Sequence, residues 1–381
     1  MTFHGEARHD HPPVPRESRR RPLKRPGWGI ARLLTYVLSV AIHALTAAIL
    51  VAAVVILVNW YDTVQGWLVG GGLAAIALWL RPRTIRPPKH AVTISRTEAP
   101  TMFEVADRIA EKVGASPVTT IHLHDLLFRC AHVRIGVRRE PTLVIGLPLL
   151  VASTPRERAA MLGVAFAHDV AGDPARGPLV RSALDTAAAW RRSLLDVRVD
   201  RYSMPDDPVV ALFAPAFPAE RMGSQIIGKL AGWVLGSPLF LAEFALTRLV
   251  SGQSRLAVHH ADQVAARAVS SQAVIEYLDA LTMAEIRLTP ILSAVRRGET
   301  LGGIREAVLN RNADHDMRRD ASVAKRTWRD LEPPTALRAA LLEASEAEEG
   351  SVGLDRGESD RIDAELERHL TRSLRELSQI T

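Results

Sequence analysis

The sequence predicts a mostly helical α+β protein that follows an N-terminal hairpin of two transmembrane helices. Two uncharged apolar runs lie near the start of the chain, and three short stretches rich in β-branched residues follow them. Much of the remainder has apolar residues at spacings of three and four, which is typical of amphipathic helices. Because the chain has 381 residues and is 47% hydrophobic, it can bury a sizeable core.

Residues 1–32 form a tail rich in Pro, His and Arg, in which eight basic side chains accompany three acidic ones. The tail has no helical or strand periodicity, so we expect a disordered basic segment. The whole chain has a net charge of +6. A basic chain can bind nucleic acid, but no recognition motif accompanies the charge, and we expect no nucleic-acid partner.

The transmembrane hairpin is predicted at 33–80, with spans at about 33–58 and 63–80. The first run is longer than the ~20 apolar residues that cross a bilayer, and the second is near the minimum. The triplet Gly70–Gly72 would let the two helices approach closely. Basic residues flank both ends and the turn carries only Asp62, so the positive-inside rule places both termini in the cytoplasm. We therefore expect a multi-pass protein of the cell membrane, with the lipid bilayer as a partner and a cytoplasmic folded domain.

The remaining chain divides into a cytoplasmic domain at 90–345 and, at 346–381, an acidic loop and a C-terminal amphipathic helix. An apolar segment at about 226–250 is interrupted by charges, and its uncharged part is too short to span a bilayer. We expect this segment to be buried or interfacial, with a helical hairpin and a re-entrant piece as alternatives. Helices are also predicted at 97–114, 154–172, 179–195, 254–269, 272–297, 332–344 and 361–377, strands at 118–125, 131–137 and 142–147, and irregular structure at 300–333.

Several residues with ligand or nucleophile chemistry are explained more simply as ordinary structure. The single cysteine, Cys130, lies near His132, but no motif surrounds the pair, and a packed thiol is expected. His122 and His124 alternate along a predicted strand, where we expect them to be partly exposed. The loop at 312–316, with the sequence NADHD, is expected to be solvated.

One helix has the outline of a zinc-binding helix without its ligands. In the H-E-x-x-H pattern, two histidines four residues apart bind one zinc ion, and the glutamate activates the metal-bound water. The matching residues here are Val164, Ala165 and His168. Valine cannot bind a metal and alanine cannot accept a proton, so only the last histidine of the pattern is present.

Four segments occur in a fixed order along the chain: LVIGLPLLVASTPRERAAMLGVAFAH, VAGDPARGPLVRSAL, SRLAVHHADQVAARA and EPPTALRAALLEA. With the preceding hairpin, they resemble the M48 family of membrane-bound zinc metallopeptidases, the HtpX-like group, and an actinobacterial-like branch of it. The resemblance extends over nearly the whole chain from about residue 30. It implies a zincin-like metallopeptidase scaffold for the cytoplasmic domain.

The resemblance also assigns the family's functional positions on the first of these helices. The first histidine of the family falls at Val164, its catalytic glutamate at Ala165 and its second histidine at His168. The Gly-Asp pair that follows the helix is retained as Gly172 and Asp173. His168 is therefore the lone remnant of the family's ligands on this helix.

Two further family positions lie later in the chain. The third zinc ligand of the family is a glutamate four residues before an Ala-Asp aspartate; the aspartate here is Asp262, so the ligand position is Val258. A histidine that precedes a Pro-Pro pair in many members falls at Glu332. With two ligands and the general base replaced, we expect no catalytic residue and no cofactor.

A rebuilt metal site is the alternative to this reading. It would use His168, His259, His260 and Asp262, and the chain would then be an active zinc metalloendopeptidase with replacement ligands. Adjacent residues on a helix point about 100° apart, so His259 and His260 cannot both take the direction of Val258.

The expected function is that of a membrane-anchored pseudopeptidase. Such a protein would use a retained cleft to bind or regulate a membrane-protein segment, a peptide or an active peptidase. The alternatives are the active metallopeptidase described above and a membrane structural or assembly protein whose cleft is unused. The sequence does not indicate an oligomeric state.

Overall fold

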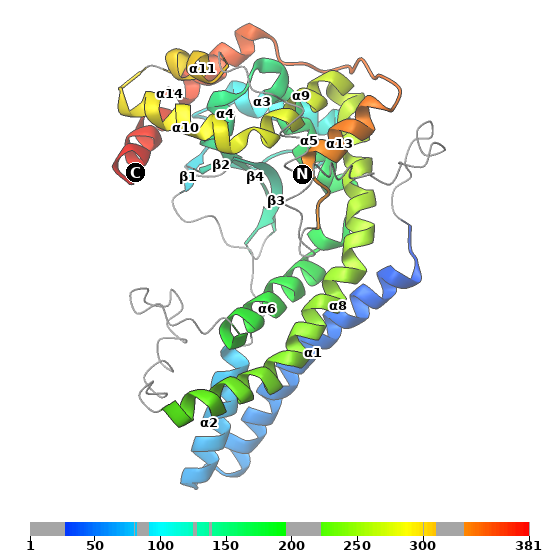
Figure 1. Cartoon of the computed structure of the whole chain (residues 1–381), viewed down its shortest axis with the longest axis vertical. Helices are drawn as coiled ribbons and strands as arrows, with labels where there is room; N and C mark the ends of the chain where they lie inside the picture. Colours follow the sequence, from blue (N-terminus) through cyan, green and yellow to red (C-terminus); the bar gives the residue numbers. More distant parts are fainter. Residues whose placement is uncertain are drawn as a thin grey trace, which may run out of the picture.

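The computed structural model describes residues 27–79, 81, 91–124, 128–136, 139–195, 222–299, 301–309 and 331–380. The described chain is a mostly helical α+β protein, with 12 α-helices and one mixed sheet of four strands. The helices are α1 Ile30–Asn59, α2 Val64–Trp79, α3 Pro100–Val113, α4 Leu147–Ala152, α5 Pro155–Val170, α6 Pro178–Leu195, α8 Met222–Val269, α9 Ser271–Thr282, α10 Ala284–Arg296, α11 Leu301–Leu309, α13 Thr335–Glu343 and α14 Arg356–Ile380. The strands are β1 Ala91–Ile94, β2 Thr120–His124, β3 Cys130–Ile135 and β4 Glu140–Gly146, and a 3₁₀ turn, η2, covers Pro174–Arg176. A head that contains the sheet stands on a stalk of long helices (Figure 1).

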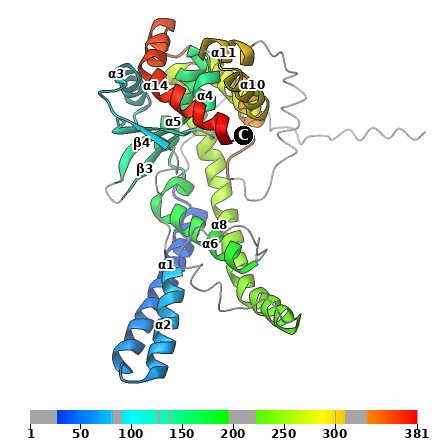
Figure 2. The ribbon, with the colours of Figure 1, turned by 90° about the vertical axis from the view of Figure 1, so that its left-hand side faces the viewer.

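The end of the stalk is a hairpin of α1 and α2 (Figures 1 and 2). Gly70 makes their close approach possible, because a Cβ there would lie 2.6 Å from Cγ of Leu57. Among the described helices, α1 alone has the length and apolarity to cross a membrane, a property that membrane anchors share with N-terminal signal sequences; α2 is shorter. The first helix begins at Ile30, so the predicted tail ends earlier than residue 32, and residues 1–26 lie outside the described chain.

The stalk is joined to the head by α6 and α8. Ile42 of α1, Val180 and Ala183 of α6, and Leu246 and Val250 of α8 pack into one small buried cluster. Beyond this cluster, the first part of α8 diverges from the hairpin (Figure 2). The three helices therefore share a core near the head and separate toward the far end of the stalk.

The predicted apolar segment at 226–250 is part of one continuous helix of 48 residues, α8. A helical hairpin and a re-entrant piece both require the chain to turn back, so those two alternatives are wrong. Within the segment, Leu246 and Val250 are buried, whereas Leu241 is 61% exposed. Charged residues interrupt the apolar pattern, but the helical backbone includes Pro238 and continues through the predicted helix at 254–269.

The sheet has the order β1-β2-β4-β3, with β2 and β4 parallel and the two outer pairs antiparallel. The three predicted strands are confirmed as β2, β3 and β4. The four-residue strand β1 was not predicted. The helix α5 crosses the sheet at β3, where the rings of His132 and Phe166 lie 5.2 Å apart between centroids.

Two further expectations about the C-terminal half need correction. Part of the stretch predicted to be irregular is helix α11. The acidic loop has exposed side chains as expected, but its backbone is not free, because the amides of Ser351 and Val352 donate to the carbonyl of Ala268 at 2.9 and 3.0 Å. Gly350 permits this approach: its φ is +74°, and a Cβ there would collide with the backbone of Val269.

Candidate functional site

The helix α5 has the start that its sequence dictates. Thr154 accepts the Glu157 amide at 3.2 Å, and the Glu157 carboxylate accepts the Thr154 amide at 2.7 Å. This reciprocal capping box satisfies two backbone donors at the helix start, and Pro155 occupies the first helical turn, where its missing N–H costs nothing. The cap fixes the start of the helix that presents Val164 and His168 one turn apart.

The residues at the zincin positions of α5 are all in the protein interior. Val164, Ala165 and His168 are each less than 7% exposed, and Val164 and Ala165 belong to the main hydrophobic core. Val258 on α8 is fully buried. Hydrocarbon thus occupies three positions at which the family's chemistry requires donor atoms.

The helices α5 and α8 are antiparallel, and their register brings Val258 near the level of His168. A Cβ at Gly163 would contact Ala265 at 3.8 Å, whereas the later residue Asp173 accepts a hydrogen bond from the earlier Ser254 at 2.6 Å. Interpolation between these two contacts places His168 opposite the turn of α8 that follows Val258.

A buried ion pair occupies the next turn of α8. Arg338 of α13 donates from Nε and Nη2 to the two carboxylate oxygens of Asp262, at 2.8 and 2.6 Å, and both side chains are almost fully buried. Burial alone would lower the pKa of the Arg338 guanidinium, but the adjacent Asp262 carboxylate raises it. The pair is bidentate, which is the strongest arrangement for arginine and a carboxylate.

A second, more exposed set of ion pairs lies near this one, because the charge of Arg338 also acts on Glu332. Glu332 accepts from Arg129 at 2.7 Å and from Arg176 at 2.9 Å. Burial alone would raise the pKa of the Glu332 carboxyl, but Arg129, Arg176 and Arg338 together hold it below its usual value. Oδ2 of Asp173 lies 3.7 Å from Nε of Arg176. Oδ1 of Asp173 accepts the amide of Ala175 and so caps the turn η2.

We call this group the arginine–carboxylate cluster. It consists of Arg129, Arg176, Arg338, Asp173, Asp262 and Glu332. Three guanidinium groups face three carboxylates, so the cluster is electrically balanced without a metal ion. Burial and then the charges of Arg176, Arg338 and Arg129 lower the pKa of His168 far below its ordinary value. The His168 imidazole is therefore neutral at physiological pH, and its Nδ1 is buried with no hydrogen-bond partner among the described residues.

These residues do not fit a zinc ion. A catalytic zinc site needs three protein ligands, and the family positions supply one imidazole and two hydrocarbon side chains. The carboxylate one turn after Val258 on α8, Asp262, already has both oxygens on Arg338. A divalent cation would also stand beside three guanidinium charges, so binding would meet repulsion as well as a poor set of donors.

The rebuilt site made of His168, His259, His260 and Asp262 stays a prediction with little support from the geometry. Within the described part of the chain, no three His, Cys, Asp or Glu side chains are grouped so that they could hold one metal ion. Burial lowers the pKa of His259; the charge of Asp262 opposes this shift and that of Arg338 adds to it. His259 thus lies in the field of the Asp262–Arg338 pair.

The other residues considered from sequence have structural roles or lie outside the described chain. Cys130 is buried, and burial raises the pKa of its thiol, so it is not poised as a nucleophile at neutral pH. His122 is buried rather than partly exposed, and its Nδ1 lies 3.0 Å from the hydroxyl of Thr93 on β1. His124 is half-buried. The loop at 312–316 is outside the described residues.

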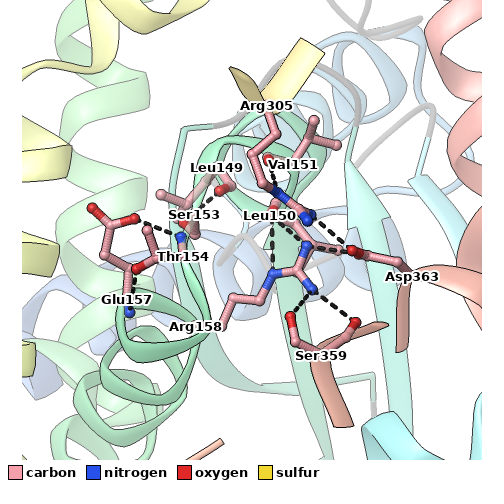
Figure 3. Close-up of polar contacts among 10 residues, drawn as sticks. All are labelled: Leu149, Leu150, Val151, Ser153, Thr154, Glu157, Arg158, Arg305, Ser359 and Asp363. Atoms are coloured by element: carbon pink, nitrogen blue, oxygen red, sulfur yellow. Dashed lines mark hydrogen bonds and ion pairs between the residues drawn. The ribbon is translucent and has the colours of Figure 1, made fainter. Parts of the chain in front are cut away.

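A second polar cluster, the C-terminal clamp, holds α14 against the start of α5 (Figure 3). It consists of Arg158, Arg305, Ser359 and Asp363. Arg158 donates twice to the Leu150 carbonyl, twice to Ser359 through its carbonyl and hydroxyl, and once to Asp363, at 2.7 to 3.3 Å. Arg305 donates to the other oxygen of Asp363 at 2.8 Å and to the Val151 carbonyl at 3.2 Å. The five guanidinium contacts of Arg158 equal the number of its N–H donors.

Sequence reasoning missed the arginines of both clusters. Arg338 lies on α13 among Ala336, Ala339 and Leu342, which are buried. An arginine in such an apolar setting is a signal that it is paired, because a buried charge requires a partner. The partner itself was not readable from sequence, since Asp262 precedes Arg338 by 76 residues.

Comparisons with protein-family models, with curated proteins and with solved structures found no match to this chain. The fold that is shown is therefore a mostly helical α+β arrangement with a small mixed sheet, and the zincin assignment goes beyond it.

Proposed function

We propose that this protein is a membrane-anchored pseudopeptidase of the M48 type, with a zincin-like scaffold and no zinc-dependent proteolysis. The observation that carries the proposal is the loss of donor atoms from the family's ligand positions, together with the pairing of Asp262 to Arg338. Val164 and Val258 supply hydrocarbon at two ligand positions, and Ala165 supplies no general base. The Asp262–Arg338 pair connects α8 to α13, and Glu332 connects Arg129, just before β3, to Arg176 in η2.

The proposed location is the cell membrane, with the α1–α2 hairpin crossing the bilayer twice and the head in the cytoplasm. In support, α1 exposes apolar side chains along its length, among them Val51, Val54 and Val55 at 50–61%. The turn end carries Trp60, Tyr61 and Trp67, all more than half exposed, as aromatic residues at a membrane interface are. Basic residues follow α2, which favours the cytoplasmic side for that end.

The proposed partner is a peptide or a segment of a membrane protein that contacts the open side of the cluster. Arg129 and Glu332 are its most accessible members, with side chains 56% and 37% exposed, whereas Asp262 and Arg338 lie beneath them. An exposed arginine beside an apolar core offers both charge and a flat surface for a carboxylate or a carbonyl. The residues at the former zinc positions are too deeply buried to contact a partner directly.

Metal content and proteolysis of one purified sample test the loss of the family chemistry. The wild-type protein should contain far less than about one zinc ion per chain, and incubation with unfolded casein should give the same result with and without chelator. Stoichiometric zinc that disappears in His168→Ala, together with casein cleavage that chelator abolishes, would establish the active enzyme instead. The apo control is wild-type protein dialysed against chelator and then reloaded with zinc.

A gain of metal binding tests the scaffold separately. The variant V164H/A165E/V258E restores the three missing family residues around the existing His168. If the scaffold is zincin-like, this variant should bind about one zinc ion, and V164H/A165E/V258E/H168A should bind much less. Equal zinc in the two variants, both folded by circular dichroism, would argue against the zincin assignment.

Photo-crosslinking separates the partner-binding function from a purely structural one. A photoreactive residue at position 129 should trap a discrete partner, and the same residue at the exposed position Glu111 on α3 serves as the control. Capture at both positions or at neither would favour the membrane structural or assembly function.

A further inference from the structure

The hairpin contains a cavity that neither the sequence nor the proposed function accounts for. It has a volume of about 470 Å³ and lies between α1 and α2. Eight residues line it: His43, Thr46, Ala47, Leu50, Ala74, Ala77, Leu78 and Arg81. Five of them are alanine or leucine, and the polar ones are His43, Thr46 and Arg81.

The cavity arises from the uneven packing of the two helices. Near the turn, Gly70 lets α2 approach Leu57 and Ala53 so closely that a side chain would collide there. Further from the turn, Ala47 on α1 and Ala74 on α2 are too short to fill the space between the backbones. An apolar space of this size does not hold ordered water without polar partners, so hydrocarbon is the matching content.

Arg81 and His43 are two of the polar side chains that line the cavity. Arg81 follows the last turn of α2. His43 is anchored on the other side, because its Nε2 lies 3.0 Å from the Ser182 hydroxyl and 3.3 Å from the Leu179 carbonyl of α6. The cavity therefore has an apolar body and a cationic rim at the end of α2 that carries the basic flank.

We propose that this cavity binds one anionic phospholipid of the cytoplasmic leaflet, with an acyl chain between α1 and α2 and the phosphate at Arg81. The inference rests on the proposed insertion of the hairpin. The apolar body matches an acyl chain, and the guanidinium matches a phosphate, for which arginine is well suited. Anionic lipids are enriched in the cytoplasmic leaflet, and the positive-inside rule places Arg81 on that side.

The test uses the full-length protein reconstituted into vesicles that contain equal amounts of phosphatidylglycerol and phosphatidylcholine. After flotation, extraction and gentle delipidation, native mass spectrometry counts the lipid that stays bound. The wild type should retain about one phosphatidylglycerol per chain, and Ala74→Phe, which fills the cavity, should lose it. Ile76→Phe adds the same bulk at an exposed position of α2 and should keep the wild-type amount.

The variant Arg81→Gln tests the phosphate contact. It should still retain lipid, but its preference for phosphatidylglycerol should fall about fivefold, as expected for one basic residue at an anionic surface. Equal retention by the wild type and Ala74→Phe, with both proteins floating with the vesicles, would overturn the lipid site while leaving the membrane location intact. Failure of the wild type to float would overturn the membrane location and the lipid site together.

Discussion

The C-terminal clamp and the arginine–carboxylate cluster both pair arginines with carboxylates, but they differ in their exposure to solvent. In the C-terminal clamp, every N–H donor of Arg158 can be matched with an acceptor, and the side chain is only 2% exposed. At the arginine–carboxylate cluster, Glu332 and Arg129 reach solvent. The neighbouring His168, whose pKa the three arginines lower, has a buried Nδ1 without a hydrogen-bond partner among the described residues. The clamp arginine is thus shielded from solvent, whereas the arginine–carboxylate cluster is partly exposed.

The difference indicates which cluster is only structural. A fully satisfied buried network rigidifies the fold, and the clamp joins α14 to the α4–α5 junction in this way (Figure 3). The sequence resemblance assigns a family ligand position to His168, and the adjoining arginine–carboxylate cluster reaches solvent through Arg129 and Glu332. This region, and not the clamp, is therefore the candidate functional site.

Loss of the clamp should have the largest effect on stability. Arg158→Met would leave the Leu150 carbonyl and one oxygen of Asp363 without their guanidinium donors, while Arg305 still binds the other oxygen. We expect a loss of about 3–5 kcal/mol. The measurement is thermal and chemical unfolding of the purified full-length protein. Arg156→Met, at an exposed position on the same helix, should stay within about 0.5 kcal/mol of the wild type. Equal effects of the two variants would mean that the clamp does not stabilise the head.

Variants of the Asp262–Arg338 pair extend the comparison of the two clusters. The loss of folding stability should depend on whether one charged partner or neither remains. Arg338→Met should destabilise the protein by about 3 kcal/mol, since a buried carboxylate is left unpaired. The double variant D262L/R338M removes both charges and should be more stable than Arg338→Met. A double-mutant cycle by chemical unfolding gives the coupling; additive effects would contradict a direct interaction.

The pH dependence should differ between the clusters, because the arginines of one lower the pKa of the neighbouring His168, whereas the clamp contains no histidine. A histidine with a lowered pKa binds fewer protons in the folded state than in the unfolded chain, so stability falls as the pH drops below the unfolded value of about 6.5. The loss can reach about 1.4 kcal/mol per pH unit for each such histidine. His168→Leu should reduce the slope below about pH 6.5, measured as melting temperature against pH, whereas an unchanged slope would show that His168 does not contribute.

The smallest effect is expected at the exposed edge of the cluster. Glu332→Gln should cost less than about 1 kcal/mol at neutral pH, because solvent screens a side chain that is more than a third exposed. The pKa of Glu332 is lower in the folded protein than its ordinary value of about 4.5. The contribution of Glu332 to folding stability is therefore present above about pH 4.5 and is lost as the pH falls through the pKa of the folded state. Chemical unfolding at neutral and acidic pH checks this, with Glu346→Gln on the exposed loop as the control. A cost of several kcal/mol would show that Glu332 is central to the cluster.

Several elements of the fold were predictable because their signals are local. The cap at Thr154, with Pro155 and Glu157, specified the start of α5 through contacts within one turn. The two apolar runs gave the helices of the hairpin to within about three residues. By contrast, the length of α8 was missed, because Glu243 and Arg248 interrupt the apolar pattern while the helical backbone continues.

Part of the candidate site was likewise predictable from the sequence, and part was not. The sequence by itself determined that donor atoms are missing at Val164, Ala165 and Val258, because the chemistry of a side chain does not depend on the fold. Only the tertiary structure decided that Asp262 binds Arg338 and that Glu332 joins Arg129 to Arg176. These pairs connect residues 76 to 203 positions apart, so they exist only where the packing of the chain brings the partners within hydrogen-bond distance. At Asp262 and Arg338 the packing also excludes the water that would screen the charges.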